Sequence, residues 1–172
     1  MMDEELSTRK RICGVINREP GIHFQEIRRR LEMATGTLEH HLLYLEKQGV
    51  VTTKHDRYYK RYFPASMDRR DKVILSGMRQ RNHRRIFVYL LLYPGSSHKE
   101  MMDDLGMKPS TLSSYLKELQ SKDIVEREKS GRESLYRLRD EKRVERIFLS
   151  YRKSLLDDIV DSFTETWLEG FI

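Results

Sequence analysis

The sequence has only one cysteine, Cys13, which excludes an internal disulfide and every metal site that needs several cysteines. Long hydrophobic runs are also missing, because the longest, Ile86 to Tyr93, falls far short of the roughly 20 residues that span a bilayer. The opening residues, Met1 to Leu6, are acidic and contain no apolar stretch, which argues against a secretory signal. We therefore expect a soluble, cytoplasmic protein that does not enter a membrane.

The motifs of common enzyme classes are missing as well. There is no glycine-rich loop that could hold phosphates, no zinc-protease helix motif and no nucleophile elbow. The adjacent histidines His40 and His41 would point about 100° apart on a helix, so they cannot share a metal ion in the usual way. We therefore predict no enzymatic activity, no cofactor and no metal site.

Charge is abundant but unevenly distributed. The 33 Lys and Arg residues against 27 Asp and Glu residues give a net charge of +6 over 172 residues, and the pI is near 9.4. Residues 1–68 carry +2, residues 69–140 carry +6 and residues 141–172 carry −2. This balance suits a polyanionic partner such as nucleic acid, and a merely solvated charged surface is the alternative. Hydrophobic residues make up only 38% of the chain, which indicates two small cores and not one deep core.

An internal repeat with a period of 74 residues aligns residues 11–63 with residues 85–137 without a gap. Thirteen of the 53 aligned positions are identical, including the Pro-Gly and Thr-Leu pairs and a tyrosine near the end. Two unrelated leucine-rich helical stretches would rarely share such pairs at matching positions in an alignment without a gap. We therefore interpret the chain as a duplication.

Each repeat is predicted to form three helices followed by a two-stranded ribbon. Thr35 and Ser97 are expected to cap helices, and Pro109 is expected to begin one. In the first repeat the expected elements are a helix that ends at Pro20-Gly21, helices over His23–Leu31 and Thr35–Gln48, and strands over Val50–Lys54 and Tyr58–Phe63. In the second repeat they are helices over Arg84–Leu92, His98–Leu105 and Pro109–Lys122, and strands over Ile124–Glu128 and Ser134–Leu138.

Residues Thr37 to Val51 combine a small polar start, a His-Leu pair, a Leu-Glu pair and a closing Gly-Val. This stretch, together with the wing sequence Asp56 to Pro64, resembles tandem winged helix-turn-helix transcription regulators, found mainly in archaea, and the metal-sensor and MarR-like repressors. The resemblance implies a mainly α fold with two winged helix-turn-helix domains, each with a small β-hairpin wing, and a long C-terminal helix. The expected divisions are a first domain at 1–66, a helical linker at 67–83, a second domain at 84–140 and a C-terminal helix at 141–172.

Helix phase indicates which side chains of the first domain face DNA. Leu38, Leu42 and Leu45 share the inward stripe, His41 packs at its edge, and the opposite face carries groups that can meet bases or phosphates. Strand alternation places Arg57 and Arg61 outward, where an arginine can enter a minor groove. The alternative is an ordinary solvated face. The predicted DNA-binding residues here are Thr35, Gly36, Thr37, His40, Tyr44, Lys47, Arg57 and Arg61.

The second recognition helix shows a small, hydroxyl-rich outward face with lysines at its start and middle, followed by a basic wing. We expect it to be the stronger electrostatic anchor. Its predicted DNA-binding residues are Lys108, Ser110, Thr111, Ser113, Ser114, Lys117, Lys129 and Arg132. Arginines of the linker region, such as Arg79 and Arg84, could line DNA or surround a solvated hinge.

The tail from Glu141 to Gly170 has a continuous helical pattern with one apolar stripe, and at 1.5 Å per residue it would be roughly 40 Å long. We predict that this stripe forms a homodimer interface, and packing within the chain is the alternative. The predicted dimerisation residues are Val144, Phe148, Tyr151, Leu155, Ile159, Phe163 and Trp167.

These features predict a sequence-specific double-stranded DNA-binding transcriptional regulator that uses two recognition helices and wings. The partners expected are double-stranded DNA and a second copy of the chain, and the sequence does not indicate a small-molecule effector. The alternative is a winged-helix adaptor of the transcription machinery without a DNA site of its own, in which Glu39, Leu43 and Tyr44 form a protein-binding patch.

Overall fold

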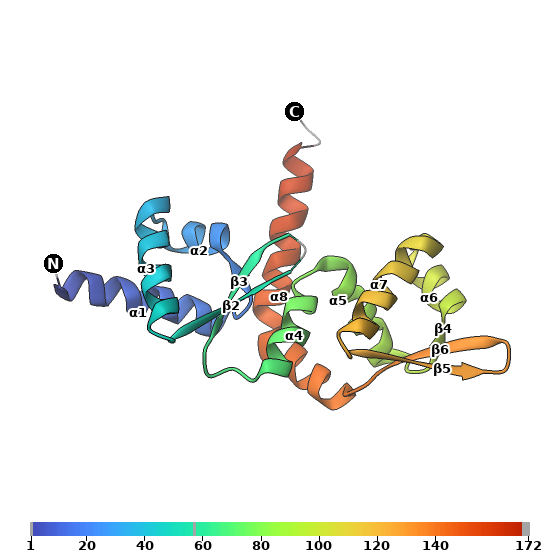
Figure 1. Cartoon of the computed structure of the whole chain (residues 1–172). Coiled ribbons are helices and arrows are strands. Elements are labelled where there is room, and N and C mark those ends of the chain that lie inside the picture. The colour runs from blue at the N-terminus through green and yellow to red at the C-terminus, as the bar shows by residue number, and fades with distance from the viewer. Residues whose placement is uncertain (1, 57, 170–172) are drawn as a thin grey trace. The chain divides into compact units, whose positions relative to one another are not determined.

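The computed structural model describes the backbone of residues 2–56 and 58–169 and the side chains of residues 3–56 and 58–156. The chain divides into two compact units, unit 1 (Met1–Ser76) and unit 2 (Gly77–Ile172), and Figure 1 labels their elements. The helix α4 (Arg69–Met78) runs across the boundary between them. No helix in the described part of the chain is both long and apolar enough to cross a membrane.

Unit 1 contains three helices followed by a hairpin, as the sequence predicts. A two-residue strand after the first helix pairs antiparallel with the second hairpin strand, which makes a three-stranded sheet in the order β1-β3-β2. The elements are α1 (Met2–Arg18), β1 (Ile22–His23), α2 (Phe24–Leu31), α3 (Thr35–Lys47), β2 (Val51–His55) and β3 (Lys60–Pro64).

Unit 2 repeats this order of elements, and its sheet has the order β4-β6-β5. The same helix, strand, helix, helix and hairpin succession in both units confirms that the two repeats form the same arrangement. The elements are α5 (Arg81–Leu92), β4 (Ser96–Ser97), α6 (His98–Leu105), α7 (Pro109–Ser121), β5 (Val125–Ser130), β6 (Glu133–Leu138) and α8 (Glu141–Glu169). The third strand of each sheet was not predicted, because two residues are too few to show an alternating pattern.

The core of unit 1 forms where the apolar periodicity places it. Ile12 and Ile16 of α1 pack with Leu38 and Leu42 of α3, and all four side chains are at most 2% exposed. His41 is buried beside them, which confirms its predicted place at the edge of the core. Because these residues recur at helical spacing, their burial leaves the opposite face of α3 exposed to solvent.

The helix starts differ between the units. Ser97 precedes α6 and forms a capping box with Glu100, in which the two residues satisfy each other's backbone N–H groups. Pro109 begins α7, as predicted. Thr35 was predicted to cap α3, and this was wrong, because Ala34 holds the capping position and Thr35 is the first helical residue. The Thr35 hydroxyl instead accepts a hydrogen bond from Arg28 at 3.4 Å.

We expect Ser97→Ala to lower the free energy of unfolding of unit 2 by about 1 kcal/mol, because it removes the hydroxyl that accepts from the Glu100 N–H. Thermal or urea unfolding followed by circular dichroism measures the change. Ser114→Ala is the matched control, since Ser114 is exposed within a helix and caps nothing. Equal stability of the two variants would contradict the capping role.

The linker arginines Arg79 and Arg84 are buried and form hydrogen bonds inside unit 2. Arg79 donates hydrogen bonds to the Ser154 hydroxyl at 3.0 Å and to the Ser154 carbonyl at 3.3 Å, and Arg84 donates to the Met78 carbonyl at 2.9 Å. Both guanidinium groups belong to residues that are less than 10% exposed. Arg79 and Arg84 therefore hold α4, α5 and α8 in place, and they are not exposed for contact with DNA.

The stripe of α8 that was predicted to form a dimer falls into three groups. Val144 and Leu155 are buried in the single chain, and α8 packs against α5. Phe148 and Tyr151 are half-buried. The side chains of the other three predicted residues lie outside the described part of the structure, and these are Ile159, Phe163 and Trp167.

Candidate nucleic-acid interface

The outward face of α3 carries most of the predicted residues of unit 1. Their exposure follows from the burial of the opposite stripe, as helix phase requires. The exposed residues are Thr35, Gly36, Thr37, His40 and Lys47. Tyr44 is also exposed, but its ring is covered on one side by the guanidinium of Arg9, which lies 3.8 Å from the ring centroid. Arg9 was not singled out in the sequence, because nothing in the pattern of α1 points to this contact.

The wing of unit 1 differs from the prediction at Arg61. This residue was predicted to face outward and bind DNA, and that was wrong, because Arg61 is 5% exposed. Its guanidinium forms an ion pair with Asp56 and donates a hydrogen bond to the Gly21 carbonyl at 2.9 Å. Strand alternation predicts an outward side chain, but Asp56 and the Gly21 carbonyl hold the guanidinium inside the unit. Arg61 therefore stabilises the fold of unit 1.

Asp56 organises the turn of this wing. Its carboxylate accepts the backbone N–H groups of Tyr58 and Tyr59, each at 2.8 Å. Burial by itself raises the pKa of Asp56, but these hydrogen bonds and the one from Arg61 outweigh it and hold the pKa below its usual value. The turn is therefore fixed by an ionised carboxylate.

The tyrosines of the wing are open to solvent. Tyr58 is 69% exposed, and it precedes β3, which begins at Lys60. Tyr59 is exposed and stacks on His23 with ring centroids 4.4 Å apart. Arg57, which was predicted to reach DNA, lies outside the described residues.

In unit 2 the predicted residues of α7 form one small, hydroxyl-rich surface. Ser110, Ser114 and Lys117 are exposed, and Lys108 is exposed just before the helix. Thr111 is half-buried at its edge. Ser113 is exposed as well, and its hydroxyl lies 2.9 Å from the His98 Nε2 at the start of α6. Sequence analysis did not select His98, because its contact with Ser113 joins residues that are 15 positions apart.

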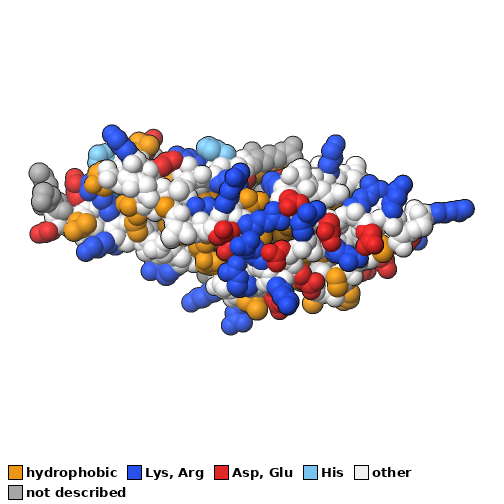
Figure 2. Space-filling view, turned by 60° about the horizontal axis from the view of Figure 1, so that its bottom comes forward, with side chains coloured by type: hydrophobic (Ala, Val, Ile, Leu, Met, Phe, Trp, Pro, Cys, Tyr) orange, Lys and Arg blue, Asp and Glu red, His pale blue; other side chains and the backbone are white. Residues whose placement is uncertain are grey.

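The wing of unit 2 presents free cations beside paired ones. Arg137 pairs with Glu128 at 2.7 Å, whereas the Lys129 and Arg132 side chains are exposed near the turn at Gly131. Figure 2 shows Lys and Arg side chains over much of the face in view, with acidic side chains between them. This surface therefore carries charges of both signs. An anion would be attracted mainly where a cation has no acidic neighbour, so the positions of the unpaired cations matter more for binding than their number.

The two units use their cations differently. Among the residues predicted to bind DNA, four cationic residues of unit 2 make no ion pair with another described residue, and these are Lys108, Lys117, Lys129 and Arg132. In unit 1, Lys60 pairs with Glu46 at 2.9 Å and Arg61 pairs with Asp56. The hydrogen bond from Lys60 lowers the pKa of Glu46, so the pair stays charged and internally neutral. The predicted interface of unit 2 therefore offers more unpaired positive charge to an anion than that of unit 1, where Lys47 makes no ion pair within the described part of the chain.

Comparisons with known proteins agree with this geometry. A family model described as an N-terminal helix-turn-helix (HTH) domain matches residues 6–75, and a model described as winged helix-turn-helix DNA-binding matches residues 79–126. The chain is 32% identical over 140 residues to an uncharacterised HTH-type transcriptional regulator of Methanocaldococcus jannaschii. That match covers 79% of this chain but 35% of the relative, so the chain spans about a third of the relative's length.

Solved structures show weaker likeness. The PcaV transcriptional regulator from Streptomyces coelicolor, in complex with its natural ligand, has 16% identity and a TM-score of 0.38, over 82% of this chain and 91% of that one. A structure of the ESCRT-II endosomal trafficking complex has 16% identity and a TM-score of 0.35, over 80% of this chain and 66% of that one. The two family matches and the repeated arrangement of helices and wing identify the chain as a tandem winged helix-turn-helix protein, related to an archaeal HTH-type transcriptional regulator.

Proposed function

We propose that the chain is a transcriptional regulator that binds a specific sequence of double-stranded DNA through both recognition helices, α3 and α7, and their wings. The observation that carries this proposal is the outward face of α7. Exposed serines leave room for close approach to a groove, and Lys117 and Lys108 flank them. Hydroxyls and ammonium groups are the types that bind phosphates and base edges.

We propose that unit 2 contributes more than unit 1 to the electrostatic attraction between the protein and DNA. The four unpaired cations of its predicted interface lie on α7, just before α7 and on the wing, so a duplex in contact with α7 would meet them from two sides. In unit 1, His40 and Lys47 remain exposed, while Arg61 and Lys60 are engaged inside the unit. We therefore propose that unit 2 supplies most of the affinity and that unit 1 adds selectivity.

We also propose that the regulator forms a homodimer through α8. Because Val144 and Leu155 are buried within the chain, the contact would use the exposed side of the helix. Leu149 and Leu156 are each about half exposed and stand seven residues apart, which is two turns on one face of a helix. Light scattering on the intact protein at several concentrations tests this proposal, and a monomer at all of them would contradict it.

We expect DNA affinity to fall steeply as salt is raised. If the four unpaired cations of the predicted interface of unit 2 each neutralise one phosphate, the affinity should drop about a hundredfold between 50 and 200 mM monovalent salt. The measurement is a fluorescence-anisotropy titration of the intact protein with a duplex selected from a random pool. An affinity that is flat across this range, or a pool that yields no enriched sequence, would contradict the proposal.

A further inference from the structure

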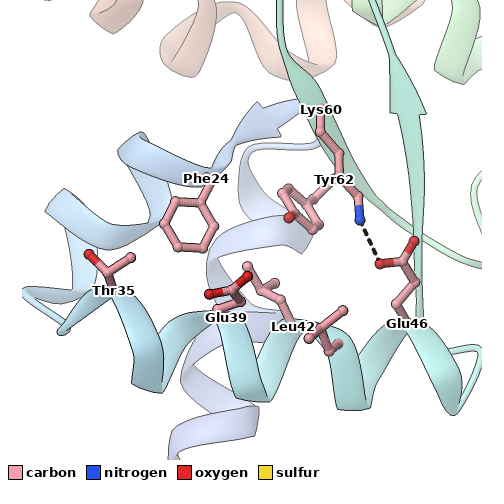
Figure 3. A pocket seen from close by; sticks show the side chains of 8 residues that line it. Phe24, Thr35, Glu39, Leu42, Glu46, Lys60 and Tyr62 are labelled. Carbon is pink, nitrogen blue, oxygen red and sulfur yellow. Dashed lines mark hydrogen bonds and ion pairs between the residues drawn. The ribbon is translucent and has the colours of Figure 1, made fainter.

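A groove of about 290 Å³ runs along α3 on the side that faces the wing of unit 1. Figure 3 shows the rings of Phe24, from α2, and Tyr62, from β3, facing α3, with the Glu39 side chain pointing toward them from the helix. Leu43 lines the same groove and is 58% exposed, so its side chain is accessible to a partner. The groove therefore combines an apolar lining with a carboxylate.

The charged side chains that line the groove are Glu39, Glu46 and Lys60, and together they carry a net charge of −1. Glu46 and Lys60 neutralise each other through their ion pair, and Glu46 also accepts a hydrogen bond from Thr53 at 2.8 Å. The Glu39 side chain is exposed, and its carboxylate makes no hydrogen bond or ion pair with any residue in the described part of the chain. A cation in the groove would therefore find Glu39 available, while an anion would be repelled.

The internal repeat shows that these residues are particular to unit 1. At a shift of 74 residues, Glu39 corresponds to Ser113 and Leu43 corresponds to Lys117. His98 stands at the place of Phe24 and is within hydrogen-bond distance of Ser113. The same site is thus polar and basic in unit 2 but apolar and acidic in unit 1. A phosphate group suits this site in unit 2 but not the groove of unit 1, because Glu39 repels it, and the exposed His40 and Lys47 of α3 do not line that groove.

We propose that the groove beside α3 in unit 1 binds a peptide segment of a partner protein, in which a Lys or Arg side chain stands next to an apolar side chain. The cation pairs with Glu39, and the apolar side chain packs on Phe24, Leu43 and Tyr62. A groove that is open along a helix suits an extended or helical segment. Charge complementarity selects a basic segment over an acidic one.

The test is selection of peptides from a phage-displayed library of random 12-residue sequences on the intact, full-length protein. We expect enriched sequences to share a Lys or Arg beside a Leu, Ile, Phe, Tyr or Trp. Synthetic versions should bind in fluorescence anisotropy and should shift the backbone amide resonances of Glu39, Leu43 and Lys60. An enrichment of acidic peptides, or no enrichment at all, would overturn the proposal.

Variants separate the groove from the rest of the surface. Glu39→Gln and Leu43→Ser should each weaken the selected peptides at least tenfold, and both positions are exposed, so folding should be unchanged. Glu4→Gln is the matched control, because Glu4 is an exposed glutamate of α1 that does not line the groove, and it should leave the affinity unchanged. Binding that survives Glu39→Gln, or an equally tight affinity for phenethylamine alone, would overturn the assignment to a basic peptide.

Discussion

Replacing Arg61 with alanine is expected to lower the free energy of unfolding of unit 1 by about 3–5 kcal/mol. The side chains of Arg61 and Asp56 are only 5% and 3% exposed, so the substitution leaves a buried carboxylate without its cation. It also leaves the Gly21 carbonyl without the donor that reaches it from 40 residues away. Urea unfolding followed by circular dichroism measures the loss.

A double variant distinguishes loss of the ion pair from loss of packing. Asp56→Leu combined with Arg61→Met removes both charges while keeping apolar volume, and we expect it to recover most of the stability that Arg61→Ala loses. Arg61→Ala with less than about 1 kcal/mol of destabilisation would show that the pair is exposed in solution.

The same ion pair sets how unit 1 responds to acid. Because the pKa of Asp56 is lowered in the folded state, its stabilisation is complete above the ordinary pKa of about 3.9 and is lost as the pH falls through the lowered value. Unfolding curves at successively lower pH should therefore show a loss of stability in wild type. Asp56→Asn, which cannot ionise, should lack this part of the loss.

A carboxylate at the centre of the α7 face should have the largest effect on DNA binding. We expect Ser114→Glu to weaken the affinity of the intact protein for its selected duplex by about 10–100-fold, since like charges brought together cost several kcal/mol at an interface. Ser114 is exposed, so the substitution should leave folding unchanged. Fluorescence anisotropy at fixed salt measures the change.

The repeat supplies the matched comparison for this variant. His40 of α3 corresponds to Ser114 at the shift of 74 residues, and His40 is also exposed. His40→Glu should weaken the same duplex by a smaller factor, because unit 1 has fewer unpaired cations. Ser114→Gln controls for side-chain size and should keep most of the affinity. Unchanged binding in Ser114→Glu would remove α7 from the interface.

The architecture could be predicted from sequence because local signals repeat. Leu38, Leu42 and Leu45 recur at helical spacing and are buried, and the same spacing recurs in α7. Gly49 adopts a positive φ of 68° after α3, as expected for a glycine that ends a helix. Exposure of the outward faces of α3 and α7 follows from this periodicity. The role of those faces in DNA binding remains our prediction.

What could not be predicted depends on contacts between distant residues. Alternation along β3 placed Arg61 outside, because a pattern of period two carries no information about Asp56 or Gly21. The pairing of Lys60 with Glu46 likewise requires the hairpin to fold back on α3. The groove of unit 1 forms only when the hairpin packs against α3. The sequence shows the residues that line the groove, but it does not show that they lie close together in space.

The duplication has a kinetic consequence. If both units bind the same duplex, as we propose, the second contact is intramolecular, and its effective concentration can reach the millimolar range where the connection lets both units contact the duplex. Here the chain from the end of β3 at Pro64 to the start of α5 at Arg81 links the two winged-helix arrangements, and it contains α4. Individually weak units can then give a long residence time together, because one unit rebinds before the other dissociates.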